Sequence, residues 1–88
     1  MKTSKQLERY FKGAANHRRI AILSLVAKND GIVLDGIVEA LGANMKTISQ
    51  HTHALVRAGL LNKKYQGRQV RHFLSPYGKA FHAFMKTF

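Results

Sequence analysis

The residues most able to do chemistry lie in one short run, residues 44–59, which reads N-M-K-T-I-S-Q-H-T-H-A-L-V-R-A-G. A serine nucleophile needs its general base within hydrogen-bonding reach, and Ser49 has His51 as its nearest candidate. If the run is helical, residues two apart point about 200° away from each other. No Asp or Glu follows Glu39, so this half of the chain supplies no carboxylate to orient a histidine. We therefore expect no enzymatic activity from this run.

Histidine is also a common metal ligand, and the chain has five of them. They are His17, His51, His53, His72 and His82. No two of them have the i, i+4 spacing of a helical zinc clamp, the chain has no cysteine, and acids are few. We expect no metal site and no cofactor, although an intersubunit site that uses His72 or His82 stays open.

The charge of the chain is strongly one-sided. Its 88 residues hold 15 Lys and Arg against 4 Asp and Glu, a formal net charge of +11, and no acid lies in residues 40–88. Such an excess of positive charge favours a polyanionic partner, most often nucleic acid. The alternative is a basic surface that is merely solvated. No apolar run is long enough to cross a bilayer, the N-terminus is polar, and cysteine is absent, so we expect a cytoplasmic protein.

Hydrophobic periodicity and turn residues predict five helices and three extended runs within a single domain, residues 1–88. The predicted helices cover residues 4–14, 17–28, 36–41, 45–58 and 76–87, and the extended runs cover 32–34, 60–65 and 70–74. Asn16, Asp35 and Asn44 are the expected N-caps. Two helices joined by a tight turn at Gly42, followed by a basic hairpin, indicate a mainly α fold, the winged helix-turn-helix.

The helix predicted over residues 45–58 has an apolar stripe and a polar face. Ile48, Leu55 and Val56, with Thr52 between them, are expected to pack on the preceding helices. The polar face has side chains that suit the base edges of the DNA major groove, where Gln pairs with adenine and Lys with guanine. The residues expected to face the bases are Met45, Lys46, Thr47, Ser49, Gln50 and His53.

A second set of basic residues surrounds this face. Lysine and arginine there supply charge to phosphates without base information. Arg68 lies at the predicted hairpin tip, where an arginine can enter a minor groove; the alternative is a solvated turn arginine. The residues expected to contact the DNA backbone or form the wing are Arg57, Lys63, Lys64, Arg68 and Arg71.

The two terminal helices carry apolar seams. Tyr77, Phe81, Phe84 and Phe88 follow one another at spacings of 4, 3 and 4, and Leu7, Phe11 and Ala14 repeat the pattern in the first helix. The middle helices already supply a core, so these seams are expected to meet across a two-fold axis in a homodimer. The expected interface residues are Leu7, Phe11, Tyr77, Phe81, Phe84 and Phe88. The alternative is that both helices fold back on their own core.

Five motifs resemble the ArsR/SmtB-type winged-helix transcriptional regulators, over about residues 10–75. They read N-H-R-R-I-A-I-L (16–23), V-E-A-L-G (38–42), T-I-S-Q-H (47–51), L-V-R-A-G-L-L (55–61) and Q-G-R-Q-V-R-H-F-L (66–74). The resemblance implies a homodimeric repressor that binds a palindromic operator in double-stranded DNA. Its fourth helix would enter the major groove, and its first and last helices would form the dimer.

The chain departs from this family at two places. Metal-sensing members carry a cysteine pair in the third helix, or Asp, His and Glu sets in the last, whereas here the third helix has no cysteine and the last offers only His82. Metal sensing is therefore not expected. Thr52 stands where the family usually has leucine. Two other functions remain open: an architectural DNA-binding protein with little sequence preference, and a winged helix that contacts protein or RNA.

Overall fold

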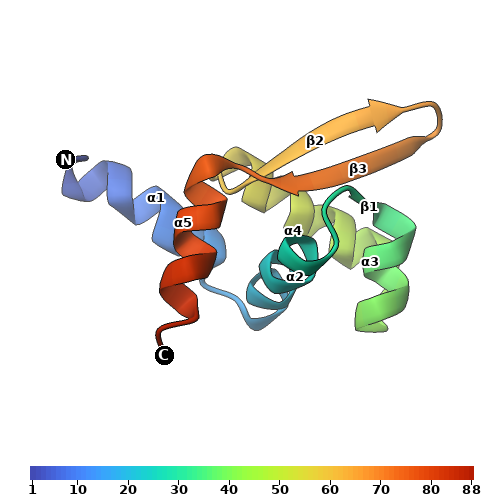
Figure 1. Cartoon of the computed structure of the whole chain (residues 1–88), viewed down its shortest axis with the longest axis horizontal. Helices are drawn as coiled ribbons and strands as arrows, with labels where there is room; N and C mark the ends of the chain where they lie inside the picture. Colours follow the sequence, from blue (N-terminus) through green and yellow to red (C-terminus); the bar gives the residue numbers. More distant parts are fainter.

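Five helices and three strands follow one another in the predicted order, in a computed structural model that describes all residues 1–88 (Figure 1). The elements are α1 (Ser4–Ala14), α2 (His17–Lys28), β1 (Ile32–Val33), α3 (Leu34–Leu41), α4 (Met45–Arg57), β2 (Leu61–Gln66), β3 (Gln69–Leu74) and α5 (Pro76–Met85). None of the helices combines the length and the apolar character needed to cross a membrane.

Side-chain caps fix where most of the helices begin. The Asn16 side chain accepts from the backbone N–H groups of Arg18 and Arg19, at 2.9 and 3.3 Å, and Asn44 accepts from the N–H of Thr47 at 2.8 Å. These caps satisfy N–H groups that have no partner within a helix, so both predicted caps are confirmed.

The start of α3 differs from the prediction. The helix begins at Leu34 rather than at residue 36, and its N-cap is Val33, which makes no side-chain cap bond. Asp35, the predicted cap, lies inside the first turn. The reason is that Val33 pairs with Arg71 in the sheet, so the chain passes from strand to helix without a loop. Helices α4 and α5 end one and two residues earlier than predicted, within the usual fraying of helix ends.

The three strands form one antiparallel sheet in the order β1-β3-β2. Strands β2 and β3 pair along their whole length, from Leu61 with Leu74 to Gln66 with Gln69, and Gly67 and Arg68 alone close the turn. Gly67 has a positive φ of 61°, which suits a tight hairpin turn. The hairpin extends beyond the helical body and forms the wing (Figure 1).

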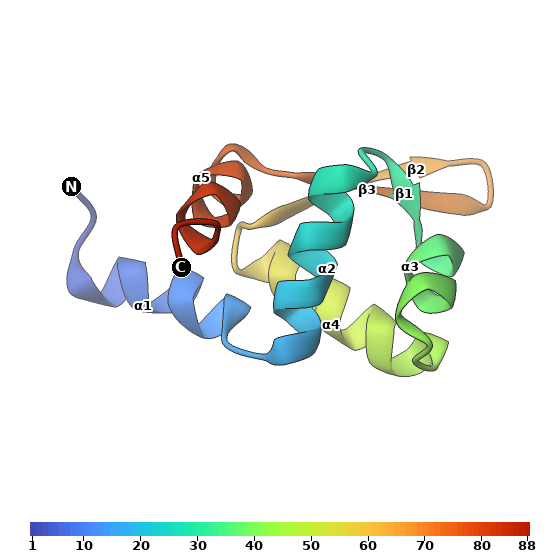
Figure 2. The ribbon, with the colours of Figure 1, turned by 60° about the horizontal axis from the view of Figure 1, so that its bottom comes forward.

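The core is built around α2, which crosses over α4 (Figure 2). Ile22, Leu23 and Val26 of α2 are buried against Ile48 and Leu55 of α4 and against neighbouring aliphatic side chains. Burying each such side chain contributes about 1.5–3 kcal/mol. The core therefore fixes α4 by its apolar stripe and leaves its other face free.

Thr52 lies in the middle of this stripe and is fully buried. Its hydroxyl donates a hydrogen bond to the Ser49 carbonyl at 3.0 Å. The polar atom therefore has a partner within its own helix, and a threonine is accommodated where the family usually has leucine.

Gly78 lies against the backbone that follows α4, and we expect its replacement by alanine to destabilise the fold. A Cβ at this position would lie 2.0 Å from the Leu60 carbonyl oxygen, which is backbone and cannot move aside easily. Gly78→Ala should lower the free energy of unfolding by about 1–3 kcal/mol, measured by urea denaturation. Lys79→Ala, at the exposed neighbouring position, is the control and should change stability little. Equal stability of Gly78→Ala and the wild type would show that the contact has no such role.

Candidate nucleic-acid interface

The outer face of α4 carries a continuous polar stripe. Lys46, Gln50, His53 and Arg57 are all exposed, and their spacings of 4, 3 and 4 place them on one side of the helix. The opposite side, with Ile48, Thr52 and Leu55, is buried. The helix therefore presents donors and acceptors outward on a rigid, core-anchored element.

The other predicted base-facing residues differ in how far they project. Met45 is exposed beside Lys46 at the start of α4, whereas Thr47 and Ser49 are half-buried. The Asn44 cap holds the backbone N–H of Thr47, so the first turn is fixed. The stripe and Met45 thus form the outermost part of the predicted face.

His51 is used to brace α4, not to activate Ser49. Its Nδ1 accepts a hydrogen bond from Arg19 Nε at 3.1 Å, and Arg19 Nη1 donates to the Gly13 carbonyl at 3.2 Å. Partial burial, with the nearby charges of Arg19, Arg18 and His17, lowers the His51 pKa. Nδ1 must be unprotonated to accept this bond, so its lone pair is not available to a serine. Sequence reasoning missed this bond, because residues 32 apart leave no local signal.

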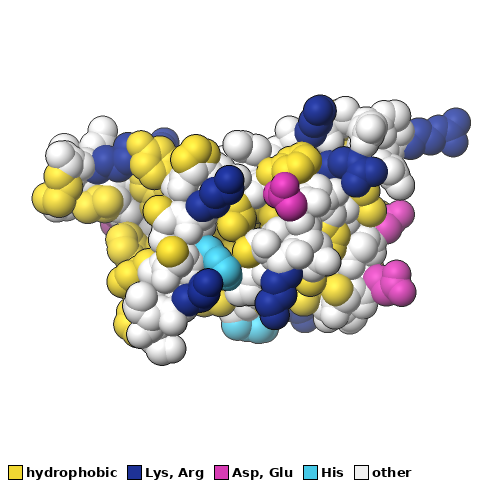
Figure 3. Space-filling view, viewed as in Figure 1, with side chains coloured by type: hydrophobic (Ala, Val, Ile, Leu, Met, Phe, Trp, Pro, Cys, Tyr) yellow, Lys and Arg dark blue, Asp and Glu magenta, His cyan; other side chains and the backbone are white.

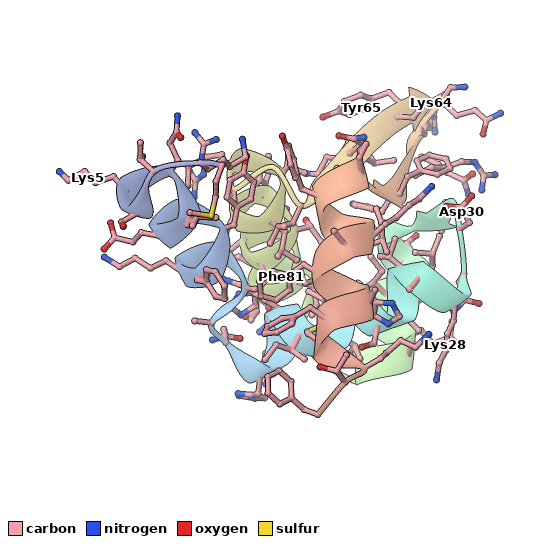
Figure 4. The ribbon with its side chains drawn as sticks, turned by 60° about the vertical axis from the view of Figure 1, so that its left-hand side comes forward. Lys5, Lys28, Asp30, Lys64, Tyr65 and Phe81 are labelled. Carbon is pink, nitrogen blue, oxygen red and sulfur yellow. The ribbon has the colours of Figure 1, made fainter.

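The wing carries basic side chains in two different settings. Lys64 and Arg68 are exposed, and Figure 4 shows Lys64 and Tyr65 on the hairpin, away from Lys5 of α1. Arg71, by contrast, donates from Nη1 to the Gly31 carbonyl at 3.0 Å and from Nε to Gln66 Oε1. Lys63 is half-buried, and burial lowers its pKa. Arg71 thus ties β3 to the turn after α2 as well as carrying charge.

The predicted interface residues lie on α1 and α5, except Phe88, which follows the end of α5 at Met85. Hydrophobic side chains gather over these helices (Figure 3). The two helices partly pack on each other: the ring centroids of Phe11 and Phe81 are 5.5 Å apart, and Phe81 lies between α1 and α5 (Figure 4). Even so, Phe11, Tyr77, Phe84 and Phe88 remain 51, 52, 47 and 93% exposed. Leu7 and Phe81 are half-buried. The seam is thus only partly covered within one chain.

An apolar groove of about 280 Å³ opens between the two helices, lined by Leu7, Phe11, Tyr77, Phe81 and Phe84 among others. Its lining is almost entirely hydrophobic, apart from Lys2, whose ammonium group lies 4.6 Å from the centre of the Tyr77 ring. A monomer that leaves large aromatic side chains exposed in this way has a surface suited to association.

The two histidines left open as intersubunit ligands have different positions. His72 is 1% exposed, its Nδ1 lies 3.0 Å from the Ile32 carbonyl, and its Nε2 is buried without a partner. A core side chain cannot reach a second subunit, so the possibility of a His72 site was wrong. His82 is half-buried on α5. No three His, Asp or Glu side chains come together in a group that could hold a metal ion.

The comparisons with known proteins give structural relatives only. No family model matches the chain, and no curated protein matches its sequence. Among solved structures, HlyU from Vibrio cholerae superposes with a TM-score of 0.85 at 28% identity, covering 93% of this chain and 86% of that one. HlyU from Vibrio vulnificus, a transcriptional regulator, gives 0.81 at 25% identity, covering 96% and 88%.

A third neighbour, Mb0332 from Mycobacterium bovis, has a TM-score of 0.86 at 27% identity, covering 94% of this chain and 77% of that one. It is described as a homodimeric winged helix-turn-helix DNA-binding domain of a possible ArsR-family regulator. These neighbours are transcriptional regulators and not enzymes, in agreement with the non-catalytic interpretation of Ser49 and His51. The mainly α fold with a small hairpin and the ArsR/SmtB resemblance are both confirmed. The chain is therefore a DNA-binding transcriptional regulator with a winged helix-turn-helix fold, similar in structure to a possible ArsR-family regulator.

Proposed function

We propose that the protein is a dimeric, sequence-specific repressor that binds a palindromic operator in double-stranded DNA. The observation that carries this proposal is the exposed polar stripe of α4. The opposite side of this helix is buried in the core, and a basic hairpin follows it in the chain. Met45, Lys46, Thr47, Ser49, Gln50 and His53 would face the bases. Arg57, Lys63, Lys64, Arg68 and Arg71 would contact the backbone or the minor groove.

A two-fold dimer explains how one small domain reaches a specific site. With α1 and α5 joined across the axis, the two α4 helices would enter successive major grooves about 34 Å apart. Each helix would read one half-site, and the two half-sites would be inverted copies of each other. The exposed aromatic seam and the homodimeric state of Mb0332 support this arrangement.

Selection of bound duplexes from a random pool, with sedimentation of the same sample, tests the proposal. A specific repressor should enrich an inverted repeat and prefer it over bulk DNA by roughly 10³-fold or more at physiological salt. Equal competition by every duplex, with affinity that follows only salt, would contradict it and favour an architectural protein, which the charge of +11 also suits. No binding to duplex DNA even at low salt would favour contacts with protein or RNA.

Gln50 and Lys64 should have separable effects on binding. Gln50→Ala should cost about 1–3 kcal/mol at the selected site and relax preference at one base pair, because it removes a base contact. Lys64→Ala should weaken binding to all duplexes alike, because it removes a phosphate contact. The slope of log affinity against log salt should fall by roughly one unit. Fluorescence anisotropy against the selected site and a scrambled duplex gives both quantities. If Gln50→Ala weakened both duplexes equally, Gln50 would not be a base-reading residue.

A further inference from the structure

A basic crevice lies at the corner where α1, α2 and the C-terminal end of α4 meet, an arrangement that Figure 2 shows from below. Its volume is about 310 Å³, and the small residues Gly13, Ala54 and Ala58 are part of its lining. The charged side chains that line it are Arg9 and Lys12 from α1, Arg19 from α2 and Arg57 from α4. Four cations from three separate elements therefore border one hollow.

No acidic side chain lines the crevice. Lys12 makes the only ion pair in the chain, with Glu8 at 3.5 Å, and both side chains are more than half exposed, so this pair contributes little. The three arginines have no carboxylate within 4.0 Å. Cations held this close repel one another unless an anion lies among them. The crevice thus has the charge of an anion site whose anion is not part of the chain.

The start of α2 has charges of the wrong sign for helix stability. Its first turn contains His17, Arg18 and Arg19 and no acid, although the positive end of a helix dipole favours negative groups. The same place would favour the approach of an anion from outside, because the dipole and the side chains attract it together.

Arg19 is held ready beside the crevice. Two of its N–H groups are used inside the protein, by His51 Nδ1 and by the Gly13 carbonyl, and these bonds fix the plane of the guanidinium. An arginine has five N–H donors, so three remain without a protein acceptor. A fixed guanidinium with free donors suits the oxygens of a phosphate.

The crevice is continuous with the outer stripe of α4. Arg57 is the last residue of that stripe and also lines the crevice. Lys46 and Arg57 are eleven residues apart, a rise of about 16 Å along the helix, whereas the major groove is about 12 Å wide. If α4 crosses the groove with its start at the bases, its end would reach the sugar-phosphate backbone at the edge.

We propose that this crevice seats a backbone phosphate of the DNA, at the edge of the major groove that α4 enters. The inference rests on the proposed DNA-binding function and extends the contact surface from α4 and the wing to α1 and α2. Arg9 and Lys12 would supply charge from α1, and Arg19 would supply directed hydrogen bonds. Because phosphates are alike at every step, this contact adds affinity without base preference.

The double variant Arg9→Gln, Lys12→Gln tests the proposal against the matched variant Lys79→Gln, Lys86→Gln. Both variants lose two positive charges from exposed positions, but the second pair lies outside the crevice, with Lys79 on α5 and Lys86 as its C-cap residue. The slope of log affinity against log salt should fall by about one unit for the crevice variant and change clearly less for the α5 variant. Circular dichroism and thermal melting establish that both variants are folded.

A phosphate-by-phosphate measurement locates the contact. Duplexes with one neutral methylphosphonate, scanned along the selected site, should reveal a position at which neutralisation weakens the wild type clearly more than the crevice variant, which keeps Arg19 and Arg57. Equal salt slopes for the two variants, or no position with this difference, would overturn the inference. The ratio of selected-site to scrambled-site affinity should stay unchanged in the crevice variant. If the wild type itself prefers no site, the repressor proposal fails, while the difference in salt slope between the two variants on any bound duplex still decides the crevice.

Discussion

Replacing Phe84 by aspartate is expected to convert the proposed dimer into a monomer. Phe84 is 47% exposed in the single chain, so the variant should still fold. In the proposed dimer the exposed half of this side chain is buried, and each protomer would lose about 0.8–1.5 kcal/mol of apolar burial. Two such losses correspond to a dimer that is roughly 10- to 100-fold weaker at about 1.4 kcal/mol per factor of ten. The burial of two carboxylates at the seam would weaken it further.

Sedimentation equilibrium measures this change directly. Tyr65→Asp is the matched control, because Tyr65 is a 73% exposed aromatic residue on the hairpin, far from the seam, and its replacement should leave the dimer intact. The Phe84→Asp monomer should also lose most of its affinity for the full inverted repeat, since it can hold only one half-site at a time. A Phe84→Asp protein that still sediments as a dimer would remove the α1–α5 seam from the proposal.

The second large effect expected is a loss of stability in mild acid, caused by His72. Burial lowers the pKa of this imidazole, and the Lys63 charge lowers it further, against the opposing effect of the Ile32 carbonyl. The Ile32 carbonyl can only accept, so Nδ1 carries the proton and Nε2 is the buried atom without a partner. Protonation of Nε2 would create a buried positive charge whose N–H has no hydrogen-bond acceptor, and this destabilises the folded state.

The direction of the pH effect follows from proton linkage. Above the ordinary histidine pKa of about 6.5, His72 is neutral in both states and contributes no pH dependence. As the pH falls below that value, His72 binds a proton in the unfolded chain but not yet in the folded chain. The free energy of unfolding then falls by at most about 1.4 kcal/mol per pH unit. The loss levels off once the pH drops below the folded pKa. The lowered pKa of His51 acts in the same direction.

Urea denaturation at fixed protein concentration between pH 7 and pH 5 measures this slope. His72→Asn is the informative variant, because its amide N–H can still donate to the Ile32 carbonyl but the side chain does not titrate. The free energy of unfolding of this variant should change less steeply with pH than that of the wild type. The difference in slope should be at most about 1.4 kcal/mol per pH unit, which corresponds to one proton. NMR titration of the imidazole should show His72 still neutral below pH 6.5 in the folded protein. Identical slopes for the two proteins would exclude His72 as the source.

Most of the fold was predictable because its signals are local. Asn16 and Asn44 precede apolar periodic runs, and the hairpin has a glycine between two extended runs, so caps and turns identify these elements without tertiary information. The start of α3 was not predictable in the same way. Asp35 has the chemistry of a cap, but pairing of Val33 with Arg71 decides where the helix begins, and that pair is 38 positions apart in the chain.

In the candidate site, too, local features could be predicted from the sequence and long-range contacts could not. The stripe Lys46, Gln50, His53 and Arg57 follows from helical spacing and could be predicted. Three other features could not be predicted, because each joins segments about 30 or more residues apart. They are the hydrogen bond from Arg19 to α4, the hydrogen bond from Arg71 to Gly31, and the burial of His72. The basic crevice was missed for the same reason: its cations come from three helices that only the tertiary fold brings together.

The joint between α4 and α5 has a consequence for the geometry of the bound DNA. Ser75 donates from its hydroxyl to the Gly59 carbonyl at 2.6 Å and from its backbone N–H to the Leu60 carbonyl at 3.1 Å, and Gly78 lies against the same carbonyl. The segment that follows α4 is thereby fastened to the start of the helix that carries the aromatic seam. In a dimer this short joint sets the angle and separation of the two α4 helices. The length of the spacer between half-sites would therefore depend on residues that touch no base.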